Sequence, residues 1–181
     1  MTSLDLNHLK YPIGKFVKPE QISESLIKEW INTIEVLPKQ LSEITKDLTI
    51  EQLNLLYRPD GWTIKQVVHH LADSHINSLI RFKLALTEDV PTIKPYHEDR
   101  WAKLIDGNDN DLTNSLSLLT GLHAKWVMLL RSLTKDELKR EFIHPEHGKR
   151  FSLEETMGIY AWHSKHHLTH IEQALKHQGQ F

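Results

Sequence analysis

The segment near the C-terminus, Tyr160-Ala161-Trp162-His163-Ser164-Lys165-His166-His167-Leu168-Thr169-His170-Ile171, has four of the chain's thirteen histidines within eight residues. They form two pairs at i, i+4, His163 with His167 and His166 with His170. On an α-helix this spacing stacks two imidazoles on one face, one turn apart. Two such nitrogens can bind one metal ion without bending the backbone. The segment therefore predicts a long helix that can contribute to a metal site, although one such pair is also common on solvated helix faces.

The two histidine pairs face different directions on this helix. His167 and His163 lie roughly 70° and 110° from the centre of the apolar face, whereas His170 and His166 lie at roughly 130° and 170°. We therefore expect the first pair beside the core. The second pair is expected to point toward water, as surface groups or as groups behind the ligands. The apolar face is defined by Leu153, Met157, Tyr160, Ala161, Leu168, Ile171 and Leu175.

Composition limits the functions that the chain can have. Its 181 residues fit a single domain, 1–181, with a sizeable core. A net charge of −2 gives no electrostatic case for nucleic-acid binding. The absence of cysteine excludes disulfides, thiolate nucleophiles and cysteine-based zinc sites. No apolar run approaches the ~20 residues of a membrane span, and the first twelve residues do not resemble a signal peptide, so a cytoplasmic protein is expected.

Helical periodicity extends along most of the chain, while strand signals are nearly absent. Proline at the first turn suggests a helix from about Pro19, with a kink or a break at Pro38. Capping-box sequences begin at Thr49, Thr63 and Ser152. We expect long helices at 19–46, 64–87, 112–133 and 153–176, preceded by an irregular lead-in at 1–17.

Shorter elements are expected between the long helices. The pattern predicts short helices at 50–56 and 100–104, another beginning at Thr134, and turns at 58–61 and 144–148. A long connection at about 88–110 is unusual in a compact domain and is often functional. The overall prediction is an all-α protein built as a four-helix bundle with short extra helices.

A third metal ligand is expected from the helix at 64–87, which contains His69, His70 and His75. His75 lies near the centre of the apolar face, where a buried histidine with a hydrogen-bond partner is the simplest interpretation. His69 and His70 both lie at the margins of that face. Periodicity alone leaves the choice among the three open.

Two separated motifs resemble those of the DinB-like superfamily, and most of all its YfiT branch. They are Trp62-Thr-Ile-Lys-Gln-Val-Val-His-His-Leu-Ala-Asp73 and Trp162-His163-x3-His167-x3-Ile171. The resemblance covers about residues 22–175 and implies a DinB-like bundle. In the family's register, the ligands would be His70, His163 and His167.

The resemblance also implies a metal-dependent enzyme, with a hydrolase as the first expectation. One divalent ion, Zn²⁺ or alternatively Ni²⁺, would activate water at an open coordination position. The runner-up is an S-transferase that activates a low-molecular-weight thiol such as bacillithiol. An alternative of another class is a non-catalytic bundle that binds a metal or a partner, with His166, His170 or His75 as fourth ligand. Family members are often dimeric, so a homodimer is expected.

Other polar residues are candidates for contacts with a small-molecule substrate. Asp73, one turn beyond His70, is the candidate catalytic group that handles protons or orients a ligand, although a carboxylate at this position is more often a surface group. Asn77 and Arg81 continue the same stripe and could bind an anionic substrate, or could equally belong to a solvated helix face. A pocket rim is expected from His97, Glu98, Asp99 and Trp101, whereas Trp62 and Trp162 are expected to pack.

Overall fold

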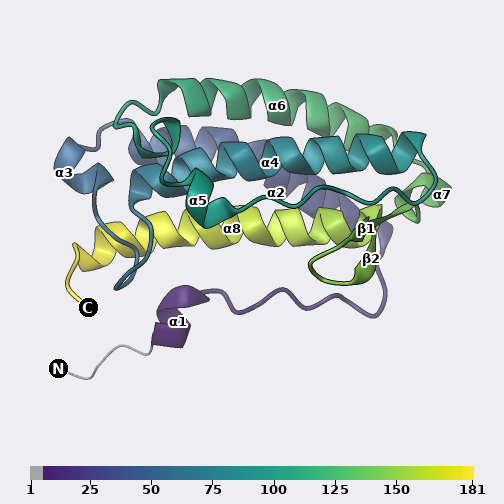
Figure 1. Ribbon diagram of the computed structural model, residues 1–181, viewed down its shortest axis with the longest axis horizontal. Helices are drawn as coiled ribbons and strands as arrows, with labels where there is room; N and C mark the ends of the chain where they lie inside the picture. The colour runs from purple at the N-terminus through teal and green to yellow at the C-terminus, as the bar shows by residue number, and fades with distance from the viewer. Residues whose placement is uncertain (1–5) are drawn as a thin grey trace.

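Four long helices form a bundle in this computed structural model, which describes residues 6–181 (Figure 1). The predicted all-α fold class is confirmed. None of the described helices combines the length and apolarity that a membrane crossing requires. The long helices are α2 (Glu24–Thr45), α4 (Ile64–Thr87), α6 (Thr113–Ser132) and α8 (Leu153–His177).

The start of α2 differs from the prediction. Ser23 caps the helix, since its Oγ accepts a hydrogen bond from the backbone N–H of Leu26 at 3.2 Å. The helix therefore begins at Glu24, five residues after the proline that suggested its start. Pro38 lies buried inside α2, and the helix continues through it without a break.

Short elements fill the ends of the bundle and the long connection. The helix expected at 50–56 is shorter, and the one expected at 100–104 lies a few residues earlier. The short elements are α1 (Leu6–Lys10), α3 (Ile50–Leu53), α5 (Glu98–Trp101), the 3₁₀ helix η1 (Asp106–Asn108), α7 (Lys135–Leu138), β1 (Glu141–His144) and β2 (Lys149–Ser152).

A β-hairpin precedes α8, which corrects the expectation that strands are nearly absent. β1 and β2 pair antiparallel with Phe142 opposite Phe151, and both rings are buried. Each strand has only four residues, which is too short for a recognisable alternating pattern. The predicted turn at 144–148 is the loop of this hairpin, with Gly148 at φ 61°.

The helices α4 and α6 run in the same direction, so the long connection must return along the bundle (Figure 1). Contacts near both N-terminal ends agree with this. The Lys65 ammonium donates to Asn110 Oδ1 at 2.9 Å, and His69 Nδ1 lies 2.8 Å from Ser115 Oγ. A crossover of this length is a known variation of four-helix topology. It places residues 95–101 beside α4 and α8, where they can border a site.

The N-terminal segment lies along the outer side of α8 (Figure 1). Gln173 Nε2 donates to the Leu9 carbonyl at 3.0 Å, and Trp162 Nε1 donates to the Gly14 carbonyl at 3.0 Å. The lead-in expected at 1–17 thus contains the short helix α1 and covers a bundle helix. Its first five residues lie outside the described part of the chain.

The core consists of two apolar clusters with a layer of buried polar side chains between them. One cluster lies toward the hairpin and includes Phe82, Trp126 and Met157. The other lies toward α3 and includes Leu41 and Ile171. The intervening layer contains the buried side chains of His70, His75, His123, His167, His170, Ser74 and Ser78, together with the half-buried His163.

Two helical glycines test how tightly α8 packs. A Cβ at Gly158 would lie 2.8 Å and 2.9 Å from carbons of the Trp30 ring, whereas a Cβ at Gly121 in α6 would meet nothing within 4 Å. We expect Gly121→Ala to raise the free energy of unfolding by about 0.5–1 kcal/mol through helix propensity. Gly158→Ala should lower it by about 1 kcal/mol or more because the new methyl overpacks the core. Urea denaturation measures both, and equal stabilisation of the two variants would contradict this packing.

Candidate metal centre

Three histidines from two helices converge in the polar layer. Nitrogens of His70 on α4 and of His163 and His167 on α8 all lie within 4.8 Å of one another. The Nε2 atoms of His70 and His163 are 3.2 Å apart, and the ring centroids of His163 and His167 are 4.4 Å apart. These are the three residues that the resemblance indicated, and the structure brings them together.

The donor set fits a transition-metal ion. Metal–nitrogen bonds of about 2.0–2.1 Å in a tetrahedral site place ligand nitrogens about 3.3–3.4 Å apart, close to the spacing of His70 and His163. Among the described residues, the group contains no fourth histidine or carboxylate. Three imidazoles with an open position suit a catalytic rather than a closed structural site. Imidazole ligands accept zinc, nickel, copper and iron alike, so they do not select the metal.

Burial keeps all three candidate ligands uncharged. It lowers the pKa of His70 to about 3, and it lowers the pKa of His163 and His167 well below the ordinary value for histidine. Neighbouring imidazoles add to the effect, because two cations would repel each other in this layer. A metal ion needs the neutral form of each ring, so the folded protein presents ligands that are already deprotonated.

Two further histidines stand behind His163. Its Nδ1 lies 3.2 Å from His75 Nε2, and His75 Nδ1 lies 2.9 Å from His123 Nε2. The Nδ1 atom of His123 donates to the Ile34 carbonyl at 2.6 Å. His75 is fully buried, and burial holds its pKa well below the ordinary value. The sequence interpretation of His75 as a buried, hydrogen-bonded residue is therefore confirmed.

The remaining candidate on α4, His69, is directed away from the other histidines. Its Nδ1 lies 2.8 Å from Ser115 Oγ, and its Nε2 donates to the Asp109 carbonyl at 3.0 Å. Both nitrogens are thus used in joining α4 to α6 and to the segment before it. The choice among three histidines, which periodicity left open, depends on these tertiary contacts.

The expectation that His166 and His170 point toward water is wrong. Both are buried, and His170 is only 1% exposed. His170 Nδ1 lies 3.4 Å from His167 Nδ1, and its Nε2 donates to the Lys10 carbonyl at 3.2 Å. The helical wheel failed here because the N-terminal segment covers the side of α8 that faces away from the bundle. His166 stacks on Trp162 with ring centroids 4.4 Å apart, so this tryptophan packs as expected.

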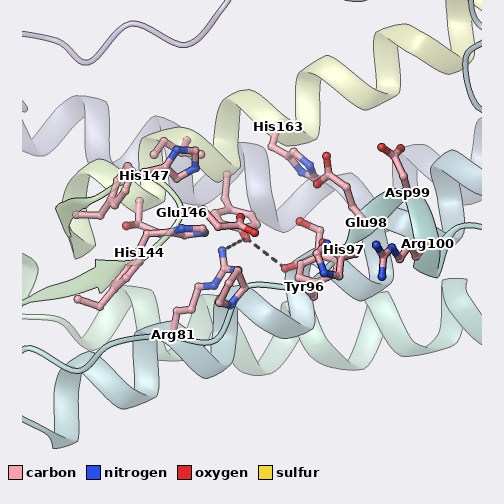
Figure 2. Close-up of a pocket in the computed structure, with 17 residues that line it drawn as sticks. Arg81, Tyr96, His97, Glu98, Asp99, Arg100, His144, Glu146, His147 and His163 are labelled. Carbon is pink, nitrogen blue, oxygen red and sulfur yellow. Dashed lines mark hydrogen bonds between the residues drawn. The ribbon is translucent and has the colours of Figure 1, made fainter.

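A pocket of about 560 Å³ opens beside His163 (Figure 2). It lies between α4, α8, the hairpin and residues 95–100 of the long connection. His97, Glu98 and Asp99 line it as predicted, but Trp101 does not. Sequence reasoning missed the contribution of His144, Glu146 and His147 from the hairpin, for which only the turn signal at 144–148 gave any hint.

Arg81 is the member of the predicted polar stripe that reaches this pocket (Figure 2). It donates to the Tyr160 hydroxyl at 3.4 Å, and that hydroxyl donates to the Ser74 carbonyl at 3.3 Å. The Tyr160 ring lies 5.6 Å from the His163 ring. A positive charge and a hydroxyl therefore stand near the candidate ligands.

The other two members of the stripe do not line this pocket. The Asn77 side chain donates to the Asp73 carbonyl of its own helix at 2.8 Å. Asp73 is half-buried, one turn beyond His70. Burial, reinforced by the charge of Asp106, raises the pKa of the Asp73 carboxyl to about 6. A carboxyl that titrates near neutrality can hold or release a proton.

Comparisons with known proteins agree with this arrangement. YfiT of Bacillus subtilis, described as a probable metal-dependent hydrolase with an unusual four-helix bundle topology, is 46% identical over 179 residues, 99% of each chain. Its structure matches with a TM-score of 0.92 over 95% of this chain and 98% of that one. A relative from Oceanobacillus iheyensis is 52% identical over 92% of this chain and 96% of its own. A relative from Bacillus cereus is 50% identical over 94% of this chain and 98% of its own. Both are provisionally named metal-dependent hydrolases. The DinB superfamily matches residues 33–171, and this chain belongs to that family.

Proposed function

We propose that this protein is a metal-dependent hydrolase that uses His70, His163 and His167 to hold one divalent ion, Zn²⁺ first and Ni²⁺ as an alternative. The observation that carries the proposal is the convergence of three neutral imidazoles beside a pocket that His163 itself lines. The hydrolase names of the relatives support the same reaction class.

The chain's own residues supply the remaining functions in this proposal. A divalent ion at such a site lowers the pKa of a coordinated water toward neutrality and so provides a nucleophile. Arg81, which lines the pocket, binds an anionic group of a small-molecule substrate. The Tyr160 hydroxyl, which donates to the Ser74 carbonyl, accepts from the Arg81 guanidinium and helps to position it. The Asp73 carboxyl, with its pKa raised to about 6, is mostly ionised at neutral pH and can accept a proton there.

The other hypotheses make different demands on the site. An S-transferase would use the same three ligands but would require a thiol cosubstrate. A non-catalytic bundle would fill the coordination sphere with a fourth residue. Two candidates for this fourth ligand, His75 and His170, contact the Nδ1 atoms of His163 and His167 instead. These contacts argue against a non-catalytic metal site. Assembly as a homodimer and location in the cytoplasm stay predictions.

Metal content tests the site directly. Elemental analysis of the untagged protein should find about one zinc or nickel ion per chain, and the His163→Ala, His167→Ala double variant should lose it, because one remaining imidazole cannot hold the ion. The matched control is His144→Ala, His147→Ala. It removes another close histidine pair, with ring centroids 4.5 Å apart, and should retain the metal.

A wild-type protein that contains no metal and cannot be loaded would refute the enzymatic proposal. Screening the loaded protein with and without low-molecular-weight thiols separates the two reaction classes. Turnover of esters or amides without any thiol supports the hydrolase, and turnover only with thiol supports the transferase.

Substrate charge tests the role of Arg81. In a panel of matched anionic and neutral substrates, Arg81→Gln should lower kcat/KM for the anionic members about 10- to 100-fold, mainly through KM, and leave the neutral members and metal content unchanged. Arg131→Gln is the control, since that arginine pairs with Glu35 on the surface between α6 and α2. An equal loss for neutral and anionic substrates would assign Arg81 a structural role.

Stability as a function of pH tests the Asp73 carboxyl. Its pKa is raised by folding from 3.8 to about 6, so the folded state binds the proton more tightly and loses stability as pH rises from about 4 to 6. In metal-free protein at pH 7, Asp73→Asn should therefore raise the free energy of unfolding by about 1–2 kcal/mol, after discounting for solvent contact. The gain should vanish below pH 4. A gain that is independent of pH would show that the carboxyl titrates normally.

A further inference from the structure

The hydrogen bond between His123 and Ile34 has only one chemically allowed polarity. A carbonyl oxygen can only accept, so the His123 Nδ1 atom, 2.6 Å away, must carry the proton. Burial lowers the pKa of His123 to about 4, which makes the ring neutral, with a single N–H. Its Nε2 is therefore an acceptor.

Pro38 explains why the Ile34 carbonyl is available. In an uninterrupted helix this carbonyl would accept from the backbone N–H of residue 38, four positions on. Proline has no N–H, so this donor is missing even though α2 continues through it. His123, on α6, supplies the hydrogen bond instead. A helix-interior proline, which normally costs stability, thus creates a defined acceptor in the middle of the bundle.

The donor and acceptor roles fixed at His123 also determine those of His75 and His163. Because His123 Nε2 accepts, His75 must donate from Nδ1 across the 2.9 Å contact, which leaves His75 Nε2 as an acceptor. His163 must then donate from Nδ1 across the 3.2 Å contact. The proton of His163 is thereby placed on Nδ1. The Nε2 atom of His163, which faces His70, is therefore unprotonated.

A second, shorter series acts on His167. His170 Nε2 must donate to the Lys10 carbonyl, so His170 Nδ1 accepts from His167 Nδ1 at 3.4 Å. His167 then keeps Nε2 for a metal ion. The Lys10 carbonyl is available because α1 ends there, and the N–H of Gly14, four residues on, donates to the Tyr11 carbonyl instead.

We propose that two histidine relays, each ending on a backbone carbonyl without its helical donor, fix the tautomers of two metal ligands. The first relay runs from Ile34 through His123 and His75 to His163. The second runs from Lys10 through His170 to His167. Both leave a bare Nε2 directed at the ion site, so His75, His123 and His170 are positioning residues. The proposal rests on the metal site of the proposed function.

The opposite polarity would be unfavourable at both ends. Reversing the first relay would place the lone pair of His123 Nδ1 against the Ile34 carbonyl oxygen, and reversing the second would oppose two acceptors at Lys10. Each reversal would also move a proton onto the Nε2 atom of a ligand. Buried acceptors without donors cost free energy, so the backbone selects the tautomers that can bind a metal. The relays use groups from α1, α2, α4, α6 and α8.

The decisive measurement is the tautomer of each buried histidine in the metal-free wild-type protein. Long-range ¹H–¹⁵N correlation spectra of ¹⁵N-histidine-labelled protein distinguish protonated Nδ1 from protonated Nε2. We expect Nδ1–H for His163, His167, His75 and His123, and Nε2–H for His170. An Nε2–H tautomer for His163 or His167 overturns the proposal. Because this readout needs neither metal nor activity, it stands apart from any failure of the proposed function.

Two variants test whether the relays act on metal binding. His123→Phe and His170→Phe each keep a ring in place but remove the imidazole that connects one relay to its backbone carbonyl. Each should shift its own ligand, His163 or His167, toward Nε2–H and weaken Zn²⁺ binding about 10- to 100-fold in chelator competition. His69→Phe is the control, since it removes an equally buried imidazole of α4 outside both relays. If folded variants keep wild-type tautomers and Zn²⁺ affinity, the relays do not position the ligands.

Discussion

Hydrogen bonds between neutral imidazoles hold the centre of this bundle together. Two apolar clusters are separated by a polar layer, and burying such a layer is costly unless every group in it finds a partner. A neutral imidazole has one donor and one acceptor, so rings in series can satisfy one another in either of two directions, and a group outside the series selects one of them. The Ile34 and Lys10 carbonyls are those outside groups. The packing of the core and the chemistry of the site therefore depend on the same contacts.

The N-terminal segment contributes directly to the candidate metal site. It covers α8 through Leu9 and Gly14 and provides the Lys10 carbonyl, which accepts a hydrogen bond from His170 Nε2. Without it, the outer face of α8 would be the solvated surface that helical periodicity predicts. The pocket lies on another side of α8, bordered by the hairpin and the long connection. The ligands are thus enclosed from behind, and one of them, His163, borders the pocket.

Local patterns predicted the helices well because caps and periodicity are local signals. The capping box of Thr63 and Gln66 begins α4 as expected. At Ser152 only half of the box forms, because the Glu155 carboxylate pairs with Lys18 and Lys149 instead of the capping residue's N–H. Contacts between residues far apart in sequence were beyond such patterns. They decided the role of His69 and the burial of His170. The hairpin was missed for a different reason, since each of its strands has only four residues.

Pro38 is an example of a residue whose effect on a long-range contact cannot be predicted from local sequence patterns. Read alone, a proline at this position predicts a kink or a break. In the fold, its consequence is that the Ile34 carbonyl, one turn earlier, lacks a helical donor. This matters only because the parallel placement of α4 and α6 brings His123 into contact with both His75 and that carbonyl. The long crossover connection allows that placement. The parallel placement of α4 and α6 and the direction of the central hydrogen bonds therefore depend on each other.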